Sequence, residues 1–228
     1  MNQLGIFAKY WEPGRVKTRL AAAIGDEAAS RLYRRFVLTL LSRFEDVGHR
    51  RVLAYTPPER RAEFESLVAD SWHLATQADG DLGQRMQHYF ADAFRCGANR
   101  VVLIGSDSPN LPIDFVNDAF QQLDTSPVVL GPADDGGYYL VGAAGGVPPI
   151  FRGVQWSSSQ VWSQTVRLLR DVGCPYGALP AWYDVDDLPG LQRMYRELGD
   201  LERLDEPLRR LREDVTKVVG TLRGGDDL

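Results

Sequence analysis

Short apolar runs alternate with amphipathic runs along most of this chain. The clearest strand is VVLIG at residues 101–105, which is apolar on both faces, as strands inside a parallel sheet are. The clearest helix spans residues 26–47, where apolar side chains recur every four residues (Ala28, Leu32, Phe36, Leu40 and Phe44). Strands that alternate with helices predict βαβ units and a mostly parallel sheet between helical layers.

The same patterns predict the other elements and one main domain. We expect strands at residues 3–9, 51–56, 72–76, 126–133, 136–143 and 176–179, and helices at 57–70, 82–95, 113–123 and 158–171. A helical region ends the chain. No repeat or linker interrupts residues 1–199, so we expect one domain there, followed by a charged helical appendage with a frayed tail at 200–228.

Composition excludes several classes of protein. A net charge of −5 argues against a general nucleic-acid binder, which needs an excess of positive charge. No apolar run reaches the roughly 20 residues of a membrane span, and the N-terminus does not resemble a secretory signal, so we expect a cytoplasmic protein. Two cysteines and three histidines make disulfide frameworks and histidine-based metal sites improbable.

Positive charge is concentrated in residues 9–20 (KYWEPGRVKTRL), directly after the first predicted strand. Lys9, Arg15, Lys17 and Arg19 stand there against a single acidic residue, Glu12. Ligands of doubly wound folds bind at the carboxyl ends of strands, and cationic side chains suit phosphate oxygens. The segment matches neither a Walker loop nor a dinucleotide fingerprint, and a solvated basic turn explains the charges about equally well.

Carboxylates follow other predicted strands. Asp107 follows the strand at 101–105, where it is a candidate Mg²⁺ or Mn²⁺ ligand or, alternatively, a helix cap. Asp184 and Asp186 of WYDVDDL project to one side of an extended segment, whereas Asp187 suits a helix cap. Asp135 of GPADDGGYYLVG lies at a strand mouth or in a plain hairpin turn.

Two enzyme classes lack their motifs. The GSDS sequence at 105–108 is not the GxSxG of a serine hydrolase, and no histidine lies in a suitable neighbouring motif. A redox enzyme would need a CxxC or a dinucleotide motif, and neither is present. Both classes are therefore disfavoured.

Six segments together resemble one family: FAKYWEPGRVKTRL, DLGQRM, LIGSDSPNLP, GPADDGGYYLVG, VQWSSSQV and WYDVDDL. The series, which spans residues 4–192, resembles small bacterial GT-A-type glycosyltransferase-like proteins, some of which are associated with arsenosugar biosynthesis. It is more distantly similar to molybdenum-cofactor and phospholactate nucleotidyltransferases. The resemblance implies a three-layer α/β/α nucleotide-diphospho-sugar-transferase fold with a mixed, mostly parallel sheet, a nucleotide-linked substrate and Mg²⁺ or Mn²⁺.

The resemblance also implies roles for individual residues. The implied nucleotide-binding residues are Lys9, Gly14, Arg15, Lys17, Arg19, Asp81, Gly83 and Arg85. The implied contacts to the sugar or acceptor are Gly136, Gly137, Tyr138 and Trp156, although Asp81 also suits a helix cap and Trp156 suits core packing. The metal-binding DxD motif of GT-A enzymes reads Ser-Asp-Ser here, so Asp107 needs a second carboxylate, for which Asp186 is the candidate.

These roles predict a metal-dependent transfer of a sugar from a nucleoside-diphosphate sugar to a small acceptor. Asp135 or Asp184 would act as the base if the reaction inverts configuration. The alternatives are nucleotidyl transfer from a nucleoside triphosphate to a phosphorylated molecule, with release of pyrophosphate, and a non-catalytic nucleotide-binding module. The nucleotide base, sugar, acceptor, stereochemistry and oligomeric state stay open.

Overall fold

The computed structural model describes residues 1–223, which divide into two compact units. Unit 1 comprises Met1–Ala8, Glu45–Gly105 and Leu111–Tyr183, and unit 2 comprises Lys9–Phe44, Ser106–Asn110 and the chain from Asp184 onward. The frayed tail expected at residues 224–228 lies outside the described residues.

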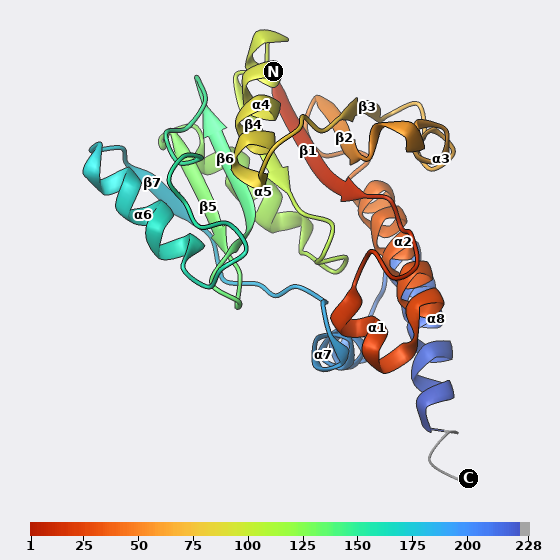
Figure 1. Ribbon diagram of the computed structural model, residues 1–228. Coiled ribbons are helices and arrows are strands. Elements are labelled where there is room, and N and C mark those ends of the chain that lie inside the picture. Colours follow the sequence, from red (N-terminus) through yellow and green to blue (C-terminus); the bar gives the residue numbers. More distant parts are fainter. Residues whose placement is uncertain (224–228) are drawn as a thin grey trace. The chain divides into compact units, whose positions relative to one another are not determined.

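Unit 1 is built on a seven-stranded mixed sheet with the order β3-β2-β1-β4-β6-β5-β7 (Figure 1). The strands are β1 (Asn2–Lys9), β2 (Arg50–Thr56), β3 (His73–Thr76), β4 (Arg100–Ile104), β5 (Val128–Pro132), β6 (Tyr138–Ala144) and β7 (Tyr176–Ala178). The pairs β1–β4, β2–β3 and β5–β7 are parallel, whereas β6 runs antiparallel to both β4 and β5. The mostly parallel mixed sheet expected from the sequence is confirmed.

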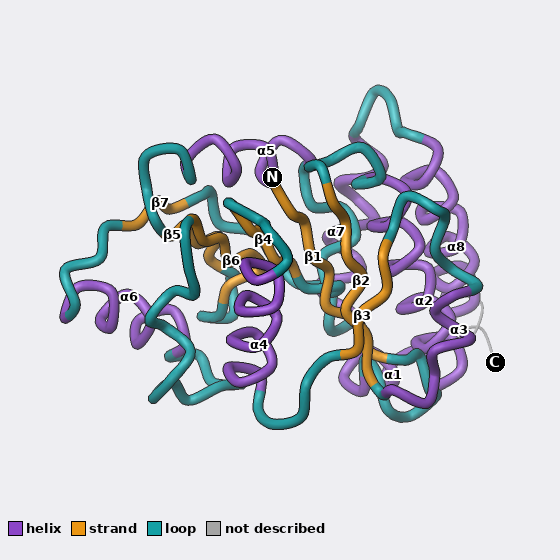
Figure 2. The backbone as a smooth tube through the Cα atoms, turned by 90° about the horizontal axis from the view of Figure 1, so that it is seen from above, coloured by secondary structure: helices purple, strands orange, loops and turns teal. Residues whose placement is uncertain are grey.

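Helices lie on both faces of this sheet (Figure 2). One face carries α4 (Leu82–Arg95) and α6 (Val161–Asp171), and the other carries α5 (Ile113–Gln122). A short 3₁₀ helix η1 (Pro58–Arg60) and α3 (Arg61–Glu65) follow β2. The predicted three-layer arrangement is therefore confirmed for unit 1.

The core of unit 1 follows from strand alternation. Val101 and Leu103 of β4 pack under α4 and α6 in a cluster with Phe90 and Leu169, all almost completely buried. Their neighbours Val102 and Ile104, which are equally buried, project to the opposite face because successive strand residues alternate in direction. A strand buried on both faces explains why residues 101–104 are continuously apolar.

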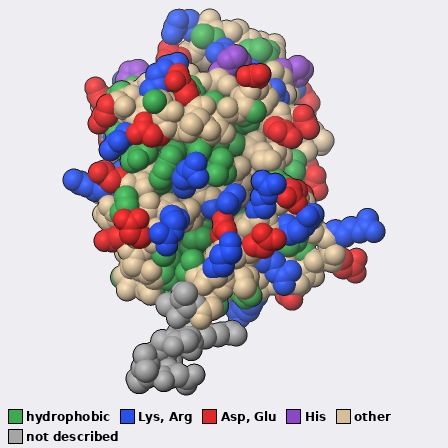
Figure 3. Space-filling model, turned by 90° about the vertical axis from the view of Figure 1, so that its right-hand side faces the viewer, with side chains coloured by type: hydrophobic (Ala, Val, Ile, Leu, Met, Phe, Trp, Pro, Cys, Tyr) green, Lys and Arg blue, Asp and Glu red, His purple; other side chains and the backbone are tan. Residues whose placement is uncertain are grey.

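Unit 2 contains the helices α1 (Thr18–Ile24), α2 (Asp26–Arg43), α7 (Leu188–Asp200) and α8 (Glu206–Arg223). Helices α2 and α8 run side by side (Figure 1), and Leu40 and Leu211 are completely buried. The ion pair from Arg35 Nε to Asp214 Oδ2, 2.6 Å long, also joins these helices. Basic, acidic and apolar side chains are interspersed on the face shown in Figure 3.

Most predicted elements are present within a few residues of their expected ends, with two exceptions. Helix α1 was not expected, because Pro13 and Gly14 dominate the pattern before it and its seven residues are too few to show a clear period. The helix expected at 57–70 ends at Glu65, and Phe64 is its one fully buried side chain. Among residues 1–223, no helix combines the length and apolarity required to cross a membrane.

Candidate functional site

Four charged side chains converge in unit 2. The ammonium of Lys17 lies 2.5 Å from Asp107 Oδ1 and 2.7 Å from Asp186 Oδ1, and Arg19 Nη2 lies 2.6 Å from Asp186 Oδ2. The Lys17 side chain is only 2% exposed, whereas those of Asp107 and Asp186 are 45% and 32% exposed. We call these four residues the charged cluster. Its carboxylates are thus open to solvent on one side and joined by a buried ammonium on the other.

Backbone geometry brings the two carboxylates together although they lie far apart in the sequence. The Val185 N–H donates to the Asp107 carbonyl oxygen at 2.8 Å, which holds the segment of Asp186 beside that of Asp107. The next residue, Asp187, caps α7 by accepting a hydrogen bond from the Gly190 N–H at 2.9 Å. The capping role expected for Asp187 is therefore confirmed. The carboxylate that joins the charged cluster is that of Asp186.

Lys17 occupies the N-cap position of α1 in a left-handed conformation, with φ 49° and ψ 42°. This conformation is uncommon for a residue with a Cβ atom. Its ammonium lies 5.7 Å from the ring centroid of Tyr33 and 5.5 Å from that of Phe36, both on α2. Aromatic faces stabilise a desolvated cation, so α2 forms the apolar side of the ammonium site.

The electrostatics of the cluster favour its ionised form. Burial by itself would lower the pKa of Lys17, but Asp107 and Asp186 together raise it. Burial would likewise raise the pKa of Asp186, but Lys17 and Arg19 hold it below the ordinary value of an aspartate. The ammonium and this carboxylate therefore stay charged at neutral pH.

Asp184 adds a third carboxylate to the same region. The Ser108 hydroxyl donates to Asp184 Oδ1 at 2.7 Å. Burial, followed by the nearby negative charge of Asp107, raises the pKa of Asp184 to about 7. Asp184 thus changes its protonation state near neutral pH.

The chemistry of the cluster fits a divalent cation. Asp107 and Asp186 aim one carboxylate oxygen each at a single cation position, which the Lys17 ammonium occupies. Mg²⁺ in proteins is usually held by one or two carboxylates, and water and substrate phosphates complete its coordination. Among residues 1–223, no group of three or more His, Cys, Asp or Glu side chains is arranged to hold a metal ion. Asp107 and Asp186 can therefore supply only part of a coordination shell.

The remaining residues of the predicted basic loop also lie in unit 2. The Lys9 ammonium donates to the Arg15 carbonyl oxygen at 2.9 Å, and the Lys9 N–H donates to the Tyr33 hydroxyl at 3.0 Å. Gly14 has φ +73°, so the turn favours glycine for conformational reasons. The Arg15 side chain is exposed. Lys9 thus braces the loop, while Arg15 is available to an anionic ligand.

The predicted residues near the start of α4 lie in unit 1, and each has a structural role. Asp81 is the N-cap of α4, where it forms a capping box with Gln84. Arg85 Nε donates to the Gly80 carbonyl oxygen at 2.9 Å. A Cβ atom on Gly83 would lie 2.3 Å from Trp156 Nε1, so glycine is required there for packing. The capping interpretation of Asp81 and the packing interpretation of Trp156 both have structural support.

The turn before β6 holds the other predicted sugar or acceptor contacts. Asp135 Oδ1 accepts a hydrogen bond from the Gly137 N–H at 2.8 Å, which closes the turn locally. Gly136 has φ +89°, and a Cβ atom there would lie 2.2 Å from the Ser159 carbonyl oxygen. Tyr138 meets Trp156 edge to face, with ring centroids 6.2 Å apart. The structure therefore brings Gly83, Gly136, Tyr138 and Trp156 into one packed region of unit 1.

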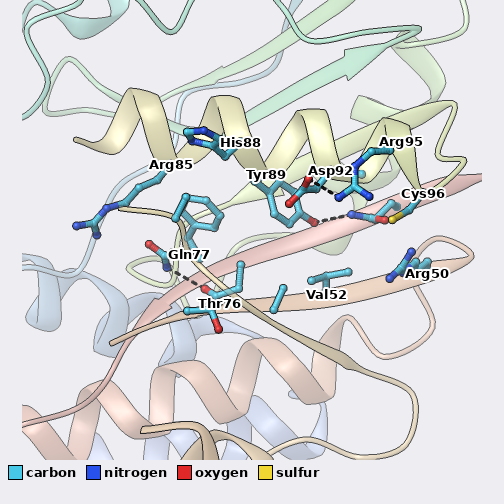
Figure 4. A pocket seen from close by; sticks show the side chains of 16 residues that line it. Arg50, Val52, Thr76, Gln77, Arg85, His88, Tyr89, Asp92, Arg95 and Cys96 are labelled. Carbon is cyan, nitrogen blue, oxygen red and sulfur yellow. Dashed lines mark hydrogen bonds and ion pairs between the residues drawn. The ribbon is translucent and has the colours of Figure 1, made fainter. Parts of the chain in front are cut away.

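A pocket of about 250 Å³ lies beneath α4 in unit 1 (Figure 4). Its lining includes Tyr89 and Arg85 from α4, together with Val52 from β2 (Figure 4). Gln3 Nε2 donates to the Tyr89 hydroxyl at 3.0 Å, whereas Gln3 Oε1 and Arg50 Nε are buried and have no hydrogen-bond partner among the described residues. This pocket was not expected from the sequence, because its residues come from segments with no shared motif.

Two residues that support the charged cluster were also missed. Ser108 directly follows Asp107 in the sequence SDSP, and this position next to a candidate metal ligand is the signal that could have identified it. Tyr33, whose hydroxyl lies 2.7 Å from Ser106 Oγ, falls within the apolar pattern of a helix and gives no separate signal. Burial, followed by the charge of Asp107, raises the pKa of this hydroxyl to about 12. Tyr33 therefore stays protonated, and its hydroxyl links the backbone at Lys9 to the side chain of Ser106.

Comparison with solved structures identifies a protein that is similar over nearly the full length of the chain. This is a protein of Desulfovibrio desulfuricans G20 described as a "putative nucleotide-diphospho-sugar transferase", with 34% identity and a TM-score of 0.88. The match covers 96% of this chain and 97% of the other. At that coverage, the similarity extends over both units.

Two more distant structures share the fold. A cytidylyltransferase from Leptospira borgpetersenii is 14% identical, with a TM-score of 0.55 and coverage of 97% of this chain and 95% of the other. CMP:2-keto-3-deoxy-manno-octonic acid synthetase, solved with CTP, is also 14% identical, with a TM-score of 0.53 and coverage of 87% and 98%. They establish the GT-A-like architecture expected from the sequence.

No curated protein matches the chain. One family model does match, over residues 39–158, which is more than half of the sequence. Its description is "Uncharacterized protein conserved in bacteria (DUF2064)". This chain therefore belongs to the DUF2064 family of bacterial proteins, and it has a GT-A-like fold.

Proposed function

We propose that this protein is a transferase that moves a sugar from a nucleoside-diphosphate sugar to a small acceptor. The observation that carries the proposal is the convergence of Asp107 and Asp186 on one cation position beside Arg19. Carboxylates that share a cation, flanked by guanidinium groups, suit the binding of a diphosphate. The description of the 34% identical protein from Desulfovibrio desulfuricans supports the same activity.

Asp107 and Asp186 would hold Mg²⁺ or Mn²⁺ in this enzyme. When bound, such an ion neutralises negative charge that builds up on the leaving diphosphate. Arg19 and Arg15 are exposed at the same segment and would donate to the phosphate oxygens. These guanidinium groups orient the diphosphate and add to the stabilisation of its charge.

The transfer step requires a base for the acceptor if the configuration inverts. The acceptor oxygen forms a bond to the anomeric carbon, while the bond from that carbon to the diphosphate oxygen breaks and its electron pair leaves with the nucleoside diphosphate. The acceptor proton passes to a carboxylate. We favour Asp184 because Ser108 holds it in the region of the cluster, and Asp135 is the second candidate.

Nucleotidyl transfer is the second candidate function. The fold shared with a cytidylyltransferase and with a CTP-bound synthetase favours it. Here an oxygen of a phosphorylated substrate would attack the α-phosphate of a nucleoside triphosphate, and the bond to pyrophosphate would break. Asp107 and Asp186 would have the same role in this reaction as in sugar transfer.

A nucleotide panel distinguishes these functions. Thermal-shift measurements with nucleoside triphosphates and nucleotide sugars, each with Mg²⁺ or Mn²⁺, would first identify the ligand. The bound nucleotide is then supplied in labelled form with candidate acceptors. Release of a nucleoside diphosphate from a nucleotide sugar supports the proposal, whereas release of pyrophosphate from a triphosphate overturns it in favour of the second candidate. Binding without turnover, equal in wild type and Asp107→Ala, would identify a non-catalytic module.

A further inference from the structure

Lys17 occupies the position that a divalent cation would need. Its Nζ atom lies within 2.7 Å of both Asp107 Oδ1 and Asp186 Oδ1. An ammonium and a divalent cation cannot share this position, because both need the same oxygens and they repel each other. Binding of one therefore requires displacement of the other.

The placement of Lys17 is specific to the local fold. The residue has a left-handed backbone at the start of α1, and its side chain is 2% exposed. Tyr33 and Phe36 face the ammonium on its apolar side. A conformation that is uncommon for lysine and a fully covered side chain show that the fold holds this ammonium in place.

The surrounding charges leave little net attraction for a second cation. Asp107 and Asp186 carry two negative charges, which Lys17 and Arg19 neutralise through three ion pairs. Asp184 lies nearby, with Oδ1 bound by the Ser108 hydroxyl. A metal ion that approaches alone meets a neutralised pair of carboxylates, whereas an ion that arrives with a polyphosphate brings new anionic oxygens for Lys17.

We propose that the Lys17 ammonium competes with the divalent metal for Asp107 and Asp186. When a nucleotide binds, this ammonium moves from the two carboxylates to the phosphate oxygens of the nucleotide. This inference deepens and rests on the proposed function. Metal and nucleotide then bind cooperatively. The nucleotide phosphates draw the Lys17 ammonium away from the carboxylates that the metal needs, and the metal in turn releases the ammonium for the phosphates. Lys17 thereby selects the metal–nucleotide complex over the free metal ion.

Mn²⁺ binding without nucleotide tests this inference directly. Electron paramagnetic resonance of free Mn²⁺ gives the affinity of the wild type and of Lys17→Met, which removes the charge and keeps a long apolar side chain. We expect Lys17→Met to bind Mn²⁺ about tenfold more tightly or better. Lys217→Met is the matched control, since it removes one positive charge from the same unit, and its ammonium contacts Asp214 Oδ1 at 3.2 Å and no residue of the charged cluster.

Three results would overturn the inference: an unchanged affinity in Lys17→Met, a weaker affinity in Lys17→Met, or an equal increase in affinity in Lys217→Met. Adding Asp107→Asn to Lys17→Met should abolish the gain, and a gain that persists would place the ion elsewhere. These measurements contain no nucleotide, so a failed transfer assay would count against the proposed function without changing the Mn²⁺ result.

A measurement on the wild type covers the case in which Lys17→Met does not fold. Nuclear magnetic resonance of ¹⁵N-labelled lysine ammonium groups reports the buried Lys17 signal directly. Titration with Mg²⁺ alone should leave this signal in place at concentrations at which Mg²⁺ together with a nucleoside diphosphate shifts it. Loss of the signal at equally low Mg²⁺ without nucleotide would overturn the proposal.

Discussion

The charged cluster of unit 2 and the pocket of unit 1 differ in whether their polar groups have partners. In the cluster, Lys17, Arg19 and the two carboxylates neutralise one another through short ion pairs. In the pocket, Gln3 Oε1 and Arg50 Nε are buried without a partner among the described residues. A ligand of the cluster must exchange existing partners, whereas a polar ligand or water in the pocket would add new ones. We therefore expect substitutions in the cluster to change activity and metal binding, and substitutions in the pocket and at tightly packed positions of unit 1 to change mainly stability.

The largest expected effect is on catalysis by the cluster. Asp107→Asn should reduce the transfer rate by about 100-fold or more, because it removes one of the two carboxylates that would hold the divalent cation beside the diphosphate. The rate is measured with the donor found in the nucleotide panel. Asp114→Asn, which changes an exposed carboxylate on α5, is the control and should retain the wild-type rate. Equal losses of transfer rate in both variants would contradict the proposed difference between the charged cluster and unit 1.

In unit 1, the largest effect should come from steric packing. Gly83→Ala places a Cβ atom 2.3 Å from Trp156 Nε1 and 2.5 Å from the Phe151 carbonyl oxygen. We expect a loss of about 1–3 kcal/mol in the free energy of unfolding, measured with urea. Gly146→Ala is the matched control, since no atom lies within 4 Å of the added Cβ there. If Gly83→Ala is as stable as the control, α4 does not pack as described.

The pH dependence of the free energy of unfolding tests the environment of the Asp184 carboxyl group in unit 2. Burial and Asp107 raise the pKa of Asp184 to about 7, above the value expected in the unfolded chain. The protonated carboxyl therefore stabilises the fold at low pH, and this contribution is lost as the pH rises through about 7.

In the presence of a chelator, the wild type should lose about 1–3 kcal/mol relative to Asp184→Asn between pH 5 and pH 8. Urea unfolding at a series of pH values measures the difference. Parallel curves for the two proteins would show that Asp184 titrates in the folded protein as it does in the unfolded chain. A steeper decline in Asp184→Asn would contradict the sign of the effect.

The smallest effect is expected in the pocket. Gln3→Met removes the unpartnered Oε1 atom together with the hydrogen bond from Nε2 to the Tyr89 hydroxyl. Loss of a buried polar group without a partner offsets loss of the bond, so the free energy of unfolding should change by less than about 1 kcal/mol. A much larger loss would mean that Gln3 Oε1 has a partner in solution, such as a bound water molecule.

The sequence was most informative where local patterns decide the structure. Alternating apolar runs predicted the strands and helices of the sheet because burial on a strand or helix face repeats with a fixed period. Helix α1 was missed because seven residues after Pro13 and Gly14 do not establish such a period. The helix after β2 was predicted too long because Leu67, Val68 and Ala69 continue the apolar pattern beyond Glu65, although none of these three residues is buried.

For the site, residue types were predictable but their partners were not. The resemblance predicted Asp107 and Asp186 as ligands of one metal ion, and this role remains a prediction. In the structure both carboxylates contact the Lys17 ammonium, although 79 positions separate them in the sequence. That the buried ammonium of Lys17 lies between them could not be predicted, because it depends on the left-handed start of α1 and on packing against α2. The roles proposed for Asp135, Arg85 and Trp156 remain predictions.

Calorimetry of Mn²⁺-dependent nucleotide binding tests the central claim most directly. The wild type is compared with the double variant Asp107→Asn/Asp186→Asn, using the nucleotide found in the panel. We expect Mn²⁺ to strengthen nucleotide binding in the wild type and to have no such effect in the double variant, because the two carboxylates that face the cation position are then neutral. Undiminished Mn²⁺ dependence in the double variant would contradict the assignment of the charged cluster as the nucleotide and metal site.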